Sequence, residues 1–250
     1  MSGLTSDMTG LAHKLAKSRG WTVEAKYTDG ITHVVCGTEK GTRTVNIRSV
    51  KYLRAVAAGK WVVTDAWLQE CQLRDIQTAE EGFEISGDKK STVPSGPRRS
   101  RILHADPDRP ALFQNFVFHF RGEFGTESPP RRELEPMLLA NGGAVRETLA
   151  SLLNANSEST VGCSSSTRRI ILFQASASSP ERDAEALAGD LVALADPSLK
   201  ERVSSGAGAE GGGVEVMRPL WLVDSIGSFR AVPPSDLHKV VLPEVVLRGL

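Results

Sequence analysis

The sequence predicts an α/β protein made of two similar repeats in tandem, each a small parallel sheet flanked by helices. Apolar residues at helical spacing alternate along the chain with short apolar segments of strand character. The same order of elements, helix, strand, strand, helix, strand and helix, occurs in both halves. The 250 residues are enough for two domains of about 100–150 residues each. Alternating helices and strands favour parallel sheets with helices on both faces.

In the first half, glycines and turn residues separate the periodic segments. Met8, Leu11 and Leu15 recur at helical spacing after a capping Thr5, and Gly20 ends that pattern. The expected elements are a helix over residues 5–19, strands over 21–27 and 31–36, a helix over 47–58, a strand over 61–63 and a third helix that carries Trp67, Leu68 and Cys71.

The second half begins with alternating aromatic residues. Phe116, Phe118 and Phe120 share one face of a predicted strand. We expect them to be core residues, together with Trp61, Trp67 and Trp221. The expected elements are strands over 112–120, 144–147, 170–173 and 214–217, and helices over 129–141, 180–194 and 219–229.

Changes in composition predict the domain boundaries. A stretch rich in Gly, Pro, Ser and charged residues separates the two halves and predicts a linker, and two segments rich in Ser or Gly predict flexible insertions. The expected parts are a first repeat over 1–74, a linker over 75–110, a second repeat over 111–235 with insertions near 154–167 and 200–213, and a C-terminal tail over 236–250.

Composition and charge exclude several classes of protein. The formal net charge is zero, which argues against a strongly basic nucleic-acid surface. The three cysteines are far apart and form no zinc-ligand spacing, and no apolar run approaches the ~20 residues that span a bilayer. The five histidines have no partner motif, and no Walker loop occurs. We therefore expect a non-catalytic protein without metal or cofactor.

Several ordered motifs resemble the BRCT repeat. They are Thr32-His33-Val34-Val35, Gly59-Lys60-Trp61-Val62-Val63 and Trp67 in the first half, and Gly142-Gly143 and Trp221 in the second. Ser2-Gly3-Leu4-Thr5, Arg48-Ser49-Val50-Lys51-Tyr52 and Gly96-Pro97-Arg98-Arg99-Ser100-Arg101 are similar to the tandem BRCT repeats of the breast-cancer susceptibility proteins and their RING-domain partners, plant relatives included. Arg48 favours the susceptibility proteins and Ser228-Phe229 favours the partners, so both assignments stay open.

The resemblance implies a nuclear module that reads phosphoserine peptides in DNA-damage signalling and repair. An alternative that it implies is a nucleosome-binding module of a RING-type ubiquitin ligase complex, with little dependence on phosphopeptides. That alternative would rely on Lys89, Lys90, Arg98 and Arg99. However, charged residues in a linker are most often exposed to water without any binding role. The expected partners are phosphorylated protein segments or the nucleosome, and neither a membrane nor a specific DNA sequence.

In this family the phosphate is held by a hydroxyl, the following glycine N–H and a lysine, which correspond here to Ser2, Gly3 and Lys51. A phosphoserine carries a charge of about −1.5 to −2 and three acceptor oxygens, so it needs donors that converge. Glycine lets the backbone approach an oxygen closely, and the following helix begins with a dipole that favours anions.

The resemblance also implies a peptide groove between the repeats. Arg48 would hold a peptide carbonyl group, although it could equally pair with a nearby acid. Leu53 is expected to pack in the core and to line the groove as well, and the opposite walls would come from Thr126, Glu127 and Val223.

Two departures from the family pattern affect these expectations. A BRCT repeat opens with a buried strand before the Ser-Gly turn, whereas here Met1 directly precedes Ser2. We therefore expect the first strand of repeat one to be truncated, with exposed edges on its neighbours and with Ser2 at a fraying terminus. Arg218 is shifted by one position from the family's arginine, so we expect no strong preference for an aromatic residue three positions after the phosphoserine.

Overall fold

The computed structural model describes residues 1–90, 93–106, 108–155, 167–194 and 214–243. The predicted insertion at 200–213 and most of the one at 154–167 lie outside these residues, as does the end of the predicted tail. The chain forms two compact units, Met1–Ala111 with Val223–Val232, and Leu112–Leu222 with Pro233–Leu250. Each unit is described by itself.

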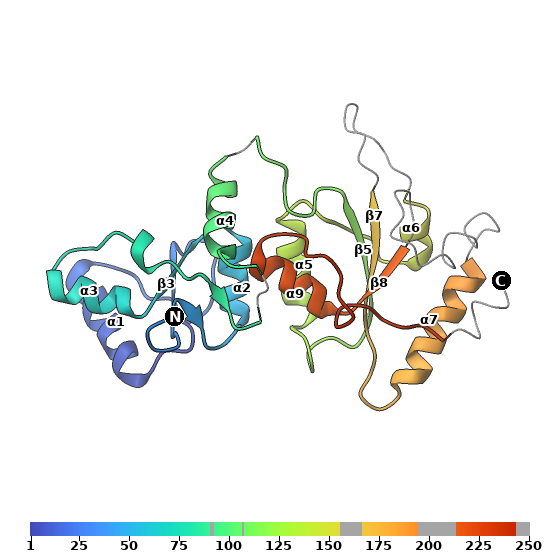
Figure 1. Ribbon diagram of the computed structural model, residues 1–250, viewed down its shortest axis with the longest axis horizontal. Coiled ribbons are helices and arrows are strands. Elements are labelled where there is room, and N and C mark those ends of the chain that lie inside the picture. The colour runs from blue at the N-terminus through green and yellow to red at the C-terminus, as the bar shows by residue number, and fades with distance from the viewer. Residues whose placement is uncertain (91–92, 107, 156–166, 195–213, 244–250) are drawn as a thin grey trace. The chain divides into compact units, whose positions relative to one another are not determined.

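The first unit follows the predicted alternation of helices and short strands (Figure 1). Its elements are α1 (Ser6–Arg19), β1 (His33–Cys36), β2 (Thr44–Val45), α2 (Val50–Ala57), β3 (Trp61–Thr64), α3 (Ala66–Arg74), a 3₁₀ turn (Glu81–Phe83), β4 (Gly87–Asp88) and α4 (Gly96–His104).

Two short parallel pairs make up the sheet structure of the first unit. Strand β1 pairs with β3, with His33 opposite Trp61, and β2 pairs with β4. Helices α1 and α3 lie together on one side of β3, and α2 and α4 lie on the other (Figure 1). Val35 and Val63 face the α1 and α3 side, where they join a core cluster with Trp67. Both faces of this small sheet are therefore covered, as expected for parallel strands.

The second unit has one continuous sheet. Four parallel strands follow the order β6-β5-β7-β8, so that β5 lies between β6 and β7. Its elements are β5 (Phe116–Gly122), α5 (Arg131–Leu139), β6 (Ala144–Val145), α6 (Leu149–Leu153), β7 (Arg168–Gln174), α7 (Pro180–Leu194), β8 (Val214–Met217) and the start of α9 (Pro219–Ser228).

The expectation that the aromatic residues form core is confirmed for most of them. Phe118, Phe120, Trp67 and Trp221 are buried. Phe118 packs edge-on against Phe113, with ring centroids 5.6 Å apart. Such edge-to-face pairs add about 0.5–1.5 kcal/mol to the effect of burial.

The predicted strand over residues 21–27 is wrong, because this segment has no regular secondary structure. Its alternating pattern is genuine, but a strand forms only where a neighbour supplies hydrogen-bond partners for its backbone. Among the described residues, no strand pairs with this segment.

The stretch predicted as a linker contains unexpected structure. Residues 75–110 hold β4 and α4, and Ser100 of α4 is buried and donates to the Val56 carbonyl oxygen. Gly96 is the first residue of the helix, and a side chain there would collide with the carbonyl oxygen of Gly227 in the same unit, so the position favours glycine. Pro97 follows in the first turn, where its missing N–H costs nothing. The domain boundaries themselves stay a prediction.

Candidate functional site

Ser2 is held by backbone hydrogen bonds at the free edge of β1. Its N–H donates to the Val35 carbonyl oxygen at 2.9 Å, and its own carbonyl oxygen accepts from the Gly37 N–H at 2.9 Å. These bonds form an isolated parallel bridge between Ser2 and Cys36. The expectation of a fraying Ser2 is therefore wrong, because the sheet edge fixes its main chain on both sides.

The Ser2 hydroxyl lies at the start of α2. Its Oγ is 2.6 Å from the Oγ of Ser49, which caps α2 by accepting from the Tyr52 N–H at 3.2 Å. A helix start carries a partial positive charge and unpaired N–H groups, which favour an anion. Sequence reasoning missed Ser49, although a serine directly before a helical pattern is a recognised capping signal.

Gly3 has the backbone conformation that glycine adopts most easily. Its φ angle is 64°, in the left-handed region. A side chain on the neighbouring Gly37 would collide with the Gly3 carbonyl oxygen, so the two segments touch backbone to backbone. The exposed side chain of Ile47 flanks Gly3, 3.9 Å from where a β-carbon on Gly3 would stand. The turn is therefore fixed in shape and open to solvent.

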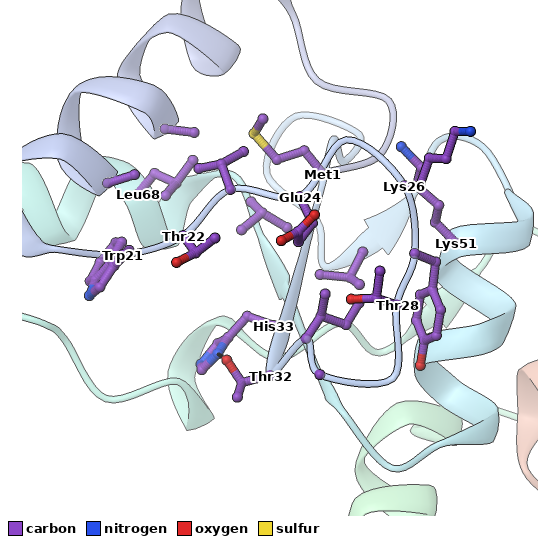
Figure 2. A pocket seen from close by; sticks show the side chains of 18 of the residues that line it. Met1, Trp21, Thr22, Glu24, Lys26, Thr28, Thr32, His33, Lys51 and Leu68 are labelled. Atoms are coloured by element: carbon purple, nitrogen blue, oxygen red, sulfur yellow. Dashed lines mark hydrogen bonds between the residues drawn. The ribbon is translucent and has the colours of Figure 1, made fainter.

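Lys51 lies in the first turn of α2, on the same helix end as Ser49. Its ammonium group donates to the Ala25 carbonyl oxygen at 2.7 Å. Lys51 and Met1 also line one pocket (Figure 2). The pKa of the Met1 amino group is lowered, first by burial and then by the positive charge of Lys51. The charge of Lys51 is therefore close enough to Met1 to affect its amino group.

Arg48 is engaged by two acids within the first unit. Its Nη2 donates to Asp88 at 2.6 Å and its Nη1 donates to Asp224 of α9. The side chain is 11% exposed and that of Asp88 is 3% exposed. Burial by itself would lower the pKa of Arg48, but the two carboxylates more than offset this and raise it. Of the two roles considered for Arg48, the structure shows the ion pair. The contact with a peptide carbonyl stays a prediction.

The remaining groove residues fall into two groups. Leu53 and Val223 are buried in the first unit, which agrees with a packing role for Leu53. Thr126 and Glu127 are exposed in the second unit, where Glu127 accepts from Gln174 at 3.3 Å. The groove combines residues of both units and stays a prediction.

The basic residues that nucleosome binding would rely on differ in their contacts. Arg99 donates to the carbonyl oxygens of Ser228 and Pro94, whereas Arg98 and Lys90 are exposed. Lys89 is exposed too and forms a loose 3.4 Å pair with Glu39.

The described ranges contain neither a candidate membrane span nor a candidate metal cluster. None of their helices is both long enough and apolar enough to cross a membrane. Within the same ranges, no three His, Cys, Asp or Glu side chains are grouped so that they could hold a metal ion.

Comparisons with known proteins agree with this geometry. Residues 3–72 match the model of the BRCA1 C Terminus (BRCT) domain. The chain is 30% identical over 148 residues to BRCA1-associated RING domain protein 1 of Arabidopsis thaliana, covering 59% of this chain and 20% of that protein. It is 32% identical over 154 residues to the mouse breast cancer type 1 susceptibility protein homolog, covering 61% of this chain and 8% of that protein. The chain thus spans a fifth or less of these relatives.

A solved structure shows the same fold over nearly the whole chain. The BRCT5-BRCT6 domains of S. pombe Brc1 superpose with a TM-score of 0.50 at 14% sequence identity, covering 93% of this chain and 92% of that one. BRCT domains are in general non-catalytic modules for protein interaction. Residues 3–72 therefore match the BRCT domain, and the chain has an α/β fold like that of tandem BRCT repeats.

Proposed function

We propose that this chain is a reader of phosphoserine peptides that acts in the nucleus in DNA-damage signalling. The observation that supports the proposal is the position of the Ser2 hydroxyl, 2.6 Å from the residue that caps α2 and next to the left-handed Gly3 turn. Lys51 adds a cation from the first turn of the same helix. These are the three kinds of donor that a phosphate dianion requires.

Phosphate binding would require the Ser2 hydroxyl to exchange its hydrogen-bond partner. The Ser2 hydroxyl would turn from Ser49 to a phosphate oxygen, and the Lys51 ammonium, which has three donor hydrogens, can keep Ala25 while it donates to the phosphate. Each charge-assisted hydrogen bond contributes about 1.5–3 kcal/mol. Much of that sum is lost to ordering of the peptide, so the residues that flank the phosphoserine must add affinity.

A lysine pair provides a matched test. Fluorescence anisotropy would compare a degenerate phosphoserine peptide library with its serine counterpart, on the unmodified chain, on Lys51→Met and on Lys60→Met. Lys60 is a good control because it also donates to a loop carbonyl oxygen, that of Asp29 at 3.1 Å, but lies outside the site. We expect Lys51→Met to weaken phosphopeptide binding by about 10- to 100-fold, the equivalent of one charge-assisted bond.

Lys60→Met should bind as the unmodified chain does. Equal binding by both variants, or equal binding of the two libraries, would contradict the proposal.

The exposure of Arg98, Lys89 and Lys90 favours nucleosome binding as the second candidate. Exposed lysines and arginines bind phosphate backbones with a strong dependence on salt. Reversing these three charges to glutamate should weaken binding to reconstituted nucleosomes in a gel-shift assay, whereas Lys51→Met should not. The opposite pattern would reject this candidate in favour of the phosphopeptide reader.

A further inference from the structure

One short motif that neither proposed function uses occurs twice in the second unit. Serine, proline, any residue and arginine follow one another at residues 128–131 and again at residues 179–182. These are the two places in the sequence where proline follows serine. Proline-directed protein kinases select a serine followed by proline, and the cyclin-dependent ones prefer a basic residue three positions after that serine. The motif alone gives the two serines equal rank as kinase substrates, so their surroundings decide between them.

Ser128 lies in a packed environment just before α5. Its Oγ is shielded from solvent and forms no hydrogen bond among the described residues. The arginine of its motif, Arg131, donates to Glu135 and to Glu147 at 2.8 Å each. The same guanidinium lies over the ring of Phe120, 5.0 Å from its centroid. A kinase would have to break these contacts to use this arginine.

Ser179 lies in a more open environment just before α7 (Figure 1). Its two neighbours in sequence, Ser178 and Pro180, are exposed, and so is Arg182, the arginine of its motif. Ser179 itself is half-buried, and its Oγ lies 3.0 Å from the Oγ of Ser176. This second motif is therefore accessible to another protein over most of its length.

The two helices that follow the motifs differ in how easily they open. A kinase binds its substrate as an extended segment, so the first turn of the helix has to unwind. In α5 the fourth residue, Leu134, is fully buried, whereas in α7 the first buried residue is Leu187, the eighth of the helix. Unwinding the first turn thus exposes core surface in α5 but not in α7. Segments with few buried contacts open most easily.

The bonds that hold the start of α7 lie near the surface. Ser176 donates its N–H and its hydroxyl to the Asp183 carboxylate, at 2.7 Å each. The Asp183 N–H donates in turn to the Ser179 carbonyl oxygen at 3.1 Å. None of these three residues is buried, so water can replace the bonds when the turn opens.

We propose that Ser179 is a phosphorylation site for a proline-directed serine kinase. The Ser179 Oγ would attack the γ-phosphorus of ATP, and the bond from that phosphorus to the ADP oxygen would break. The hydroxyl proton passes to the aspartate base of the kinase, and the products are phosphoserine and ADP. Ser128 stays unmodified in the folded chain, because its motif is packed.

A phosphate on Ser179 meets opposing charges. It adds a charge of about −1.5 to −2 at a helix start, which favours an anion. The pKa of Asp183 is lowered first by the hydrogen bonds from Ser176 and then by the charges of Arg182 and Arg121, so both arginines lie near this helix start. The carboxylates of the first turn repel the phosphate. Because these effects oppose one another, we expect the modified α7 to stay folded.

Two peptides separate the motif from its surroundings. Residues 122–134 and 173–185, each acetylated and amidated, place the two serines at the centre of unfolded segments of equal length. A purified cyclin-dependent kinase with Mg²⁺ and ATP should phosphorylate both peptides, because neither motif is covered by a fold. The rate on each peptide is then the reference for the same serine in the chain.

The 250-residue chain is treated with the same kinase, and mass spectrometry with fragmentation measures the phosphate on each serine. Relative to its own peptide, Ser179 should react within about threefold, and Ser128 should react at least about tenfold more slowly. Ser179→Ala should remove the main product. Ser128→Ala is the matched control and should leave that product unchanged.

Amide hydrogen exchange followed by NMR tests the physical reason. The Asp183 N–H donates to the carbonyl oxygen of Ser179, and the Leu134 N–H donates to that of Pro130, so each reports the first turn of its helix. The Asp183 N–H should exchange at least about tenfold faster than the Leu134 N–H.

Three outcomes would overturn the proposal. They are a peptide 173–185 that is not a substrate, a chain in which Ser179 does not react, and a chain in which Ser128 reacts as fast as Ser179 relative to the peptides. Equal exchange of the two amides would overturn the reason given for the selection of Ser179. None of these measurements involves Ser2 or Lys51, so their outcome is independent of phosphopeptide binding.

Discussion

The two units both alternate helices with short parallel strands, but their sheets differ in extent. In the second unit β5 and β7 are seven residues long and are paired over their whole length. In the first unit β1 and β3 have four residues each, and the alternating segment at 21–27 is not a strand. The difference teaches that an alternating pattern gives a strand only when a central partner satisfies its backbone. The predictions below test what β5 contributes to the second unit and what the Ser2 bridge and the contacts of β1 contribute to the first.

The largest effect is expected where the central strand is present. Phe118 of β5 is fully buried and packs against Phe113, Phe116 and Trp221. Replacing it with alanine should lower the free energy of unfolding of the second unit by about 3–5 kcal/mol, because a large cavity forms in a dense core. Amide hydrogen exchange of β7 in increasing urea measures this, with the amides of β3 in the first unit as the internal reference.

If β7 loses less than about 1 kcal/mol of protection, β5 does not organise the second sheet as argued. Phe124 is half-buried, and among the described rings it pairs with Phe120, so Phe124→Ala should have a clearly smaller effect.

A smaller effect is expected at the Ser2 bridge of the first unit. A side chain at Gly37 would collide with the Gly3 carbonyl oxygen, a backbone atom that cannot move without breaking the Ser2 bridge. Gly37→Ala should destabilise the first unit by about 1–3 kcal/mol through overpacking. It should also weaken phosphopeptide binding, because Ser2 and Gly3 would shift.

Gly30→Ala is the matched control, since an added side chain there meets no atom within 4 Å. Thermal unfolding followed by circular dichroism, together with peptide anisotropy, measures both effects. Equal stability of the two variants would show that the close contact of Gly37 with Gly3 does not stabilise the first unit.

Much of the helical structure could be predicted from local signals. Gly20 ends α1 with a φ of 69°, as the sequence predicted, and Thr5 caps its start by accepting from the Met8 N–H. Helix α4 was missed because Gly96 and Pro97 resemble a loop, although proline in a first turn also begins helices. The strand at 21–27 was wrong because its formation depends on a neighbour and not on its own pattern.

The candidate site could be predicted only in part. The resemblance selected Ser2, Gly3 and Lys51, and the structure places the first two and the start of α2 together. Their joint binding of phosphate stays a prediction. The partners of Arg48 are 40 and 176 positions away in sequence, and no local pattern indicates contacts of that range.

The smallest effect concerns the free edge of the first unit. His33 of β1 stacks on Trp67, with ring centroids 5.3 Å apart, and its Nε2 lies 3.1 Å from Glu80. Burial by itself would raise the pKa of Glu80, but hydrogen bonds from Gln77 and His33 outweigh it and lower that pKa. A carboxylate with a lowered pKa in the folded state stabilises the fold above its unfolded pKa. This contribution is lost as pH falls from about 5 through the folded value.

Glu80→Gln should therefore make stability less dependent on pH between 6 and 3. Urea unfolding at several pH values measures the dependence, with the exposed Glu81→Gln as the control. The difference should be small, because the contact joins partly exposed side chains and is screened by water. If the acid-induced loss is the same in Glu80→Gln and in the unmodified chain, the Glu80 contact does not anchor the free edge of β1.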